Sequence, residues 1–206
     1  MDLNATKHAF KAGSSYVQQN LDAKHFSFLK EYFDVNNAFI YDKIKLIVWP
    51  FNNIFDFLYK PDLYIPIMSM ITLVLFKSTN HGFNHTFDPE KLFFMFSRNC
   101  AALIGLPILY MIFAFILAAK ISYMPLICFS GYKYVVILFI RVLFNFFYKI
   151  VAYFLSIYLL VAYFLFFTRS IKTHIQKKSN EFDLKLNFVF GLAIIEILLI
   201  IVMQRE

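Results

Sequence analysis

Three charged residues stand inside apolar runs of this sequence and could do chemistry in a membrane. Glu196 lies in the middle of the last apolar run, and Lys133 and Arg141 lie within an earlier one. A lone charge at the bilayer centre costs about 2.5–3.5 kcal/mol on insertion scales, so such groups usually pair inside the protein. Arg141 and Glu196 lie at similar distances from the ends of their runs, which predicts an ion pair between them. The alternative is a polar pathway for a proton or a solute, formed by Glu196, Arg141 and Lys133.

A second polar group lies between two apolar runs and contains metal-ligand residue types. These residues are His81, His85, Asp88 and Glu90. A His-x-x-x-His pair binds metal when a helix fixes its geometry, whereas Gly82 and the Asp88-Pro89 step indicate a loop that ends at a helix start. We therefore expect no metal site. The sequence also has no nucleophile elbow, phosphate-binding glycine loop or zinc-protease motif, so we expect neither catalysis nor a cofactor.

The composition excludes a soluble domain. The 206 residues are 60% hydrophobic and only 16% charged, against about 45–50% and about 25% in typical soluble domains. Disorder requires low hydrophobicity and high charge, so it is excluded as well. The net charge of +7 is explained by basic residues beside membrane spans rather than by nucleic-acid binding. The composition predicts an all-α polytopic membrane protein.

Five apolar runs are candidate transmembrane helices. A span needs about 20 mostly apolar residues, and four runs meet this: residues 99–119, 125–147, 150–168 and 184–203. Only two residues separate the second and third of these, which predicts a hairpin. The fifth run, residues 63–79, is at the short limit and contains Lys77, so its alternative is a segment lying at the membrane surface. The expected division is a short N-terminal cytosolic region, residues 1–61, and a five-span membrane domain, residues 62–206.

The distribution of basic residues favours five spans over four. With five, nine flanking basic residues share one side and four the other, whereas four spans give seven against six. Because cytosolic flanks carry the excess of Lys and Arg, the N-terminus is expected in the cytosol and the C-terminus in the lumen. The glycosylation sequon at Asn84 then lies on the lumenal side.

The end of the cytosolic region is expected to form an amphipathic helix at the membrane. Over residues 38–51, apolar positions including Ile40, Ile44 and Ile47 recur at helical spacing. Asp42, Lys43 and Lys45 are expected on the opposite, polar face. The alternatives are a plain membrane anchor and a partner-binding surface.

Three strings are more specific than their composition. The first is Tyr32-Phe33-Asp34-Val35-Asn36-Asn37-Ala38-Phe39, continuing to Trp49-Pro50-Phe51. The second is Pro61-Asp62-Leu63-Tyr64-Ile65-Pro66-Ile67-Met68, and the third is Ser130-Gly131-Tyr132-Lys133-Tyr134-Val135. In this order and spacing, the chain resembles the Yip-interacting factor (Yif) family of Yip-domain membrane proteins. It resembles a reduced member with a short cytosolic tail.

The resemblance implies five spans, a cytosolic N-terminus and residence in endoplasmic reticulum and Golgi membranes. It implies no catalysis. It further implies a hetero-oligomer with Yip-type membrane proteins, association with Rab-type GTPases, and a role in COPII-vesicle transport from the endoplasmic reticulum to the Golgi.

The strings suggest candidate partner-binding residues near the cytosolic face. These are Tyr32, Phe33, Asp34, Val35, Asn36, Asn37, Asp62, Leu63, Tyr64, Pro66, Gly131, Tyr132, Lys133 and Tyr134. In physical terms, Asn36 and Asp62 can cap helices and Gly131 allows close helix approach. The alternative is that these residues fix how the chain enters the bundle.

Overall fold

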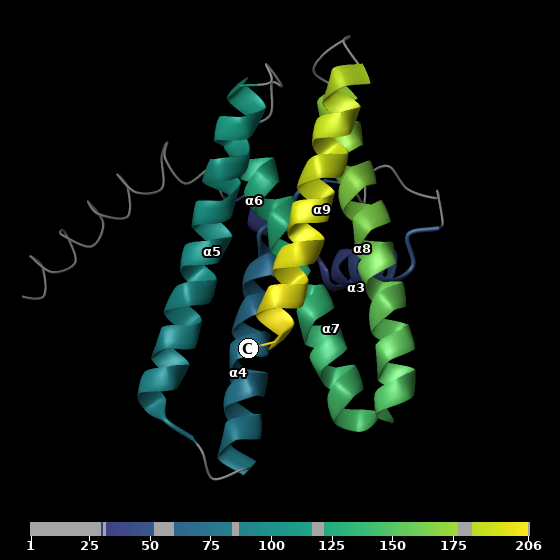
Figure 1. Cartoon of the computed structure of the whole chain (residues 1–206). Helices are drawn as coiled ribbons and strands as arrows, with labels where there is room; N and C mark the ends of the chain where they lie inside the picture. Colours follow the sequence, from purple (N-terminus) through teal and green to yellow (C-terminus); the bar gives the residue numbers. More distant parts are fainter. Residues whose placement is uncertain are drawn as a thin grey trace, which may run out of the picture. The chain divides into compact units, whose positions relative to one another are not determined.

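The computed structural model describes residues 30, 32–51, 60–83, 87–116, 122–176 and 183–205, and these are helices joined by short connections (Figure 1). The helices are α3 Asn37–Val48, α4 Tyr64–Phe83, α5 Pro89–Ile116, α6 Tyr123–Gly131, α7 Lys133–Phe146, α8 Lys149–Gln176 and α9 Asp183–Arg205. Contacts divide the chain after Asp34, and Val35–Glu206 forms one compact unit. The predicted all-α fold is confirmed over the described residues.

Four helical segments are long and apolar enough to cross a membrane: Pro89–Ile116, Tyr123–Phe146, Lys149–Thr173 and Asn187–Gln204. They correspond to the four stronger spans expected from the sequence. The fifth expected span lies on α4, which is 20 residues long but is not among the four, because its last turns are polar. Length and composition therefore support a polytopic membrane protein.

The ends of two helices differ from the sequence prediction, whereas one helix start and one hairpin are confirmed. α5 begins at Pro89, the helix start predicted from the Asp88-Pro89 step, and Asp88 accepts a 3.0 Å hydrogen bond from the Glu90 N–H. The helix therefore starts ten residues before its expected apolar span. α8 continues to Gln176, beyond the expected end of its apolar run. α4 continues to Phe83 and so includes Gly82, which was expected in a loop. The expected hairpin is present, with a short turn at Phe147 and Tyr148 between α7 and α8.

The span Tyr123–Phe146 lies at the centre of the bundle. Of an apolar 18-residue stretch within this span, 72% is buried, against 28–39% for the corresponding stretches of the other three spans. It contacts α4, α5, α8 and α9, and it is broken at Tyr132 into α6 and α7. This central, interrupted helix positions the polar residues of the site.

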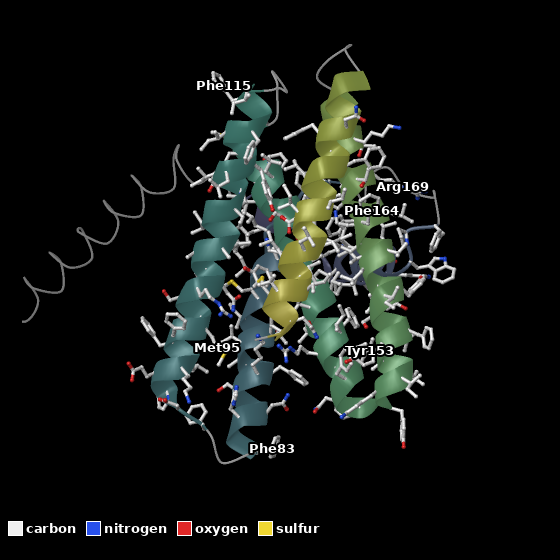
Figure 2. All side chains as sticks on the ribbon, in the orientation of Figure 1. Phe83, Met95, Phe115, Tyr153, Phe164 and Arg169 are labelled. Carbon is white, nitrogen blue, oxygen red and sulfur yellow. The ribbon has the colours of Figure 1, made fainter. Side chains whose placement is uncertain are left out.

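The outer faces of the helices expose large apolar side chains. On α5, Phe93 is 72% exposed and Phe115 is 86% exposed, and Figure 2 shows Phe115 pointing away from the neighbouring helices. Contiguous apolar surface on this scale is unusual for a soluble monomer and is typical of helices that face lipid. The exposed apolar side chains and the helix lengths thus both support a membrane protein.

α3 forms where the sequence predicts it, but its inward face is different. The helix begins after Asn36, whose side-chain oxygen accepts a 2.7 Å hydrogen bond from the Phe39 N–H, as expected of a cap. Ile47 of the predicted apolar stripe is buried, whereas Ile40 and Ile44 are half-buried and Leu46, outside that stripe, is buried as well. Lys43 was expected on the polar face and is instead fully buried. Its ammonium group lies 3.9 Å from the buried carboxylate of Asp62, which compensates its charge.

The C-terminal end of α3 is fixed to α8 by two hydrogen bonds. Tyr158 donates through its hydroxyl to the Val48 carbonyl over 3.0 Å, and the Arg169 guanidinium donates to the Pro50 carbonyl. Carbonyls at a helix end have no partner within the helix, so these bonds satisfy groups that would otherwise need water. The C-terminal end of α3 is therefore held against α8 at a defined position.

Candidate functional site

The first buried polar group, named here the Lys43 cluster, consists of Lys43, Asp62 and Tyr132. The Tyr132 hydroxyl donates a hydrogen bond to Asp62 Oδ2, and Lys43 Nζ lies 3.9 Å from the same oxygen. Lys43 Nζ also donates to the Lys60 carbonyl over 2.7 Å and lies 5.2 Å from the centroid of the Tyr132 ring. The cluster thereby joins α3, the segment before α4 and the helix break.

Asp62 has a second role as the cap of α4. Its Oδ1 accepts a 3.0 Å hydrogen bond from the Ile65 N–H, which satisfies one of the free donors at the helix start. The expectation that Asp62 caps this helix is confirmed. One carboxylate therefore begins α4 with one oxygen and binds Tyr132 and Lys43 with the other.

Burial dominates the electrostatics of the Lys43 cluster. Burial lowers the pKa of Lys43 to about 8, against the attraction of Asp62 and Cys128. Burial also raises the pKa of Asp62, against the Tyr132 hydrogen bond, the charge of Lys43 and the Ile65 N–H. Both groups shift toward their neutral forms, so desolvation outweighs their mutual attraction.

The second buried polar group, named here the Glu196 cluster, consists of Ser130, Lys133 and Glu196. Lys133 Nζ lies 3.2 Å from Glu196 Oε2, and both side chains are fully buried. The Ser130 hydroxyl donates to Glu196 Oε1 over 2.6 Å and accepts from Lys133 Nζ over 3.1 Å. Each carboxylate oxygen thus has its own donor. The cluster fastens α9 to both sides of the break between α6 and α7.

Tyrosines from three further helix faces surround the Glu196 carboxylate. The Tyr134 hydroxyl donates to the Asn99 carbonyl over 2.8 Å, and the Tyr163 hydroxyl donates to the Phe129 carbonyl over 3.4 Å. Tyr110 of α5 has a buried hydroxyl and interacts electrostatically with Glu196. These aromatic residues exclude solvent from the ion pair.

The predicted Arg141–Glu196 pair is wrong. Glu196 pairs with Lys133, and the Arg141 side chain donates to the Gln204 carbonyl. Both contacts join residues 63 positions apart, which shows that α7 and α9 run parallel with a fixed register. Counting from the ends of the apolar runs misplaced this register by eight residues, or about 12 Å along a helix.

Gly131 allows three helices to approach closely at the break. A Cβ atom added there would lie 2.5 Å from Pro66 Cβ and 3.0 Å from Leu103 Cδ1. No side chain larger than hydrogen fits without movement of α4 or α5. Pro66 of the second string and Gly131 of the third string are therefore in close contact.

Most members of the second and third strings are buried within the chain. Relative exposure is 2% for Asp62, 7% for Leu63 and zero for Tyr132, Lys133 and Tyr134. The first string is more exposed: Asp34, Asn36 and Asn37 are exposed and Phe33 is 44% exposed, while Tyr32, Val35 and Tyr64 are half-buried. Burial favours the interpretation that the second and third strings fix how the chain enters the bundle. The sequon residue Asn84 and His85 lie outside the described residues.

Sequence reasoning missed Ser130, Lys43 and Arg169 as members of polar contacts. Ser130 opens the third string and lies one helical turn before Lys133, which was an available signal. Lys43 lies one turn from both Phe39 and Ile47, so the same spacing that identified the apolar stripe could have placed it inside. Nothing in the sequence indicated that Arg169 binds the Pro50 carbonyl.

The chain is similar to a family of eukaryotic membrane proteins over nearly its whole length. The profile of the YIF1 family matches residues 1–203. Protein transport protein YIF1 of Saccharomyces cerevisiae is 31% identical over 179 residues, which cover 75% of this chain and 56% of that protein. Protein transport protein yif1 of Schizosaccharomyces pombe is 26% identical over 205 residues, which cover 87% and 70%. Protein YIF1B of Danio rerio is 31% identical over 140 residues, which cover 60% and 46%.

The chain thus spans only about half of the budding-yeast and zebrafish proteins. No solved structure matches it. The family match includes all three strings and every residue of both polar clusters. From the extent of that match and from its four membrane-length helices, this chain is a multi-pass membrane protein belonging to the YIF1 family.

Proposed function

We propose that this protein is a non-enzymatic trafficking factor for vesicle transport from the endoplasmic reticulum to the Golgi. It acts in a hetero-oligomer with Yip-type membrane proteins and with Rab-type GTPases. The observation that carries the proposal is membership of the YIF1 family, whose yeast members are named protein transport proteins. The internal pairing of Lys43 with Asp62 and of Lys133 with Glu196 supports a structural rather than a catalytic use of these charges.

The outward face of α3 is the proposed contact for the cytosolic partner. Asn37, Tyr41 and Lys45 follow one another at four-residue spacing, and all three are exposed, with Tyr41 69% exposed. The opposite face is fixed to the bundle through Lys43, Leu46 and Ile47. A rigidly held helix with one free face suits partner binding, because little ordering is needed on association. Asn36, which is exposed and caps α3, extends the proposal.

We further propose that α4 spans the membrane as a fifth helix, with the N-terminus cytosolic and the C-terminus lumenal. Its 20 residues are long enough to cross, and it packs against the central helix α7. Labelling with a membrane-impermeant thiol reagent tests this proposal. The two native cysteines are first replaced, and Lys45→Cys or Lys91→Cys then introduces a single thiol. In sealed vesicles whose cytosolic face is outside, the cysteine at position 45 should react and that at 91 should not. Equal labelling would reject the fifth span.

Co-purification tests the proposed function. The tagged full chain is isolated from membranes in mild detergent, and proteins recovered with it are quantified by mass spectrometry. We expect a second Yip-domain protein in near-stoichiometric amount, and a Rab-type GTPase that is depleted by Lys45→Glu. Lys91→Glu is the matched control, because Lys91 is also an exposed lysine and lies, by this proposal, on the opposite side of the membrane. Recovery of the intact, monodisperse chain alone would contradict the proposal.

A small transporter or channel using Glu196, Arg141 and Lys133 is the second candidate. The interruption of the central helix at Tyr132 favours it, because transporters place polar groups at broken helices. Against it, Lys133 and Glu196 are paired and fully buried, and Arg141 lies eight residues from Lys133 on the same helix. Solute or proton flux in liposomes that is abolished by Glu196→Gln would establish this function instead.

A further inference from the structure

A pocket of about 510 Å³ lies between α7, α8 and α9. This volume falls within the range of about 300–1,000 Å³ that is typical of small-molecule sites. Most of the lining is apolar, with Ile140 and Ile200 buried at the back. The polar lining residues are Arg141, Ser156 and Gln204. The pocket is separate from the Lys43 and Glu196 clusters, none of whose members lines it.

The polar end of the pocket has unused hydrogen-bonding capacity. Among the described residues, Arg141 Nε and Gln204 Oε1 are buried without a hydrogen-bond partner. One terminal nitrogen of Arg141 donates to the Gln204 carbonyl. Within the described residues, no carboxylate pairs with Arg141. A guanidinium is always charged, and in apolar surroundings it is stabilised by an anion that accepts from its fork of N–H groups. The positive charge of Arg141 therefore favours an anionic ligand in this pocket.

The position of the pocket relative to the membrane indicates a ligand that is anionic at one end and apolar at the other. Gln204 ends the apolar run of α9, and Arg141 lies five residues before the end of α7, so the polar end is near one membrane boundary. Toward the bilayer interior the wall continues through Ile157 and Leu160 of α8. A headgroup at the boundary and a hydrocarbon chain along this wall would match both parts.

The mouth of the pocket faces the lipid-exposed side of the bundle. Tyr153 is 61% exposed, Ile157 58% and Ile201 38%, and all three line the pocket. Figure 2 shows Tyr153 on α8 close to the α7–α8 hairpin. A ligand can therefore enter laterally from the bilayer without passing through the protein core.

We propose that this pocket binds one glycerophospholipid with a net anionic headgroup. The phosphate accepts from Arg141 and one acyl chain lies along Ile157 and Leu160. The bound lipid would complete the packing between the hairpin and α9 and supply an acceptor for Arg141 Nε. The proposal concerns this chain in any bilayer and does not depend on its trafficking partners.

Native mass spectrometry of the full chain in detergent tests the site. The protein is incubated with equal amounts of phosphatidylinositol and phosphatidylcholine, and retained lipid is measured as the protein is activated. We expect preferential retention of phosphatidylinositol, weakened about tenfold or more by Arg141→Gln, because the loss of one charge-assisted contact is at least about 1.4 kcal/mol. Arg141→Lys should retain part of the preference. Lys149→Gln is the matched control, because it removes an exposed charge from the same hairpin.

A second pair of variants tests the volume of the pocket independently of charge. Ser156→Leu fills the space beside Arg141, whereas Ser156→Ala leaves it open. We expect lipid retention to fall with Ser156→Leu and to persist with Ser156→Ala, with both proteins monodisperse on size exclusion. Equal retention of the two lipids, or a preference that survives both Arg141→Gln and Ser156→Leu, would overturn the proposal.

Discussion

Removing the charge of Glu196 isolates the contribution of the buried ion pair. Glu196→Gln keeps the size of the side chain and an oxygen that can accept from Ser130, so the main loss is the attraction to Lys133. At the observed 3.2 Å, that attraction is about 5 kcal/mol for an effective dielectric constant of about 20. Breaking a buried pair by removing one partner typically destabilises by about 3–5 kcal/mol, because the other charge is left uncompensated.

The assay is thermal unfolding of the purified chain in detergent, followed by Trp49 fluorescence. For a chain of this size, the expected loss corresponds to a melting temperature lower by roughly 6–20 °C. Glu90→Gln is the control, because the same change at an exposed residue in the first turn of α5 should lower stability by at most about 1 kcal/mol.

A second substitution distinguishes an ion pair from two independent effects. Adding Lys133→Met to Glu196→Gln removes the stranded charge, so we expect the double variant to recover most of the lost stability. If Glu196→Gln melts within a degree or two of the wild type, or if the two losses simply add, the pairing deduced from the structure is incorrect.

Three further outcomes follow from the break and from the Lys43 cluster. Gly131→Ala should destabilise by about 1–3 kcal/mol through overpacking, whereas Gly191→Ala, with no atom within 4 Å of the added Cβ, should be neutral or slightly stabilising; thermal melts of both variants compare them. Because the pKa of Lys43 is lowered to about 8, the unfolded chain binds more protons between about pH 8 and 10.5, so stability should rise with pH there. Lys43→Met should remove that rise, as measured by melting temperature across the range. Asp62→Ala removes both the α4 cap and the acceptor of Tyr132, and it should increase proteolysis at α3 more than at the α7–α8 hairpin.

The membrane architecture could be predicted from the sequence because apolar runs report length and composition directly. The four longer apolar runs lie on helices of membrane length. The short interval between the second and third of these runs forms the turn of the α7–α8 hairpin. Helix starts were predicted correctly where a side-chain cap was recognised, as at Asn36, Asp62 and Asp88. Each cap is a local interaction, so neighbouring residues are sufficient to identify it.

The partners of the buried charges could not be predicted in the same way. Whether Glu196 contacts Lys133 or Arg141 depends on the register of α7 against α9, and the apolar runs misplaced that register by eight residues, or about two turns. Lys43 was assigned to a polar face because helical periodicity does not show that Asp62, 19 residues later, lies opposite it. Long-range polar pairing requires the packed structure, and for that reason the internal role of the second and third strings emerged only there.

Transport of a reporter glycoprotein tests the central claim most directly. In cells depleted of this protein, a pulse-labelled cargo is followed for conversion of its glycans from the endoplasmic-reticulum form to the Golgi form. We predict that depletion delays conversion, that the wild-type chain restores it, and that Lys45→Glu restores it less well than Lys91→Glu. Conversion at the normal rate after depletion would contradict a function in transport from the endoplasmic reticulum to the Golgi.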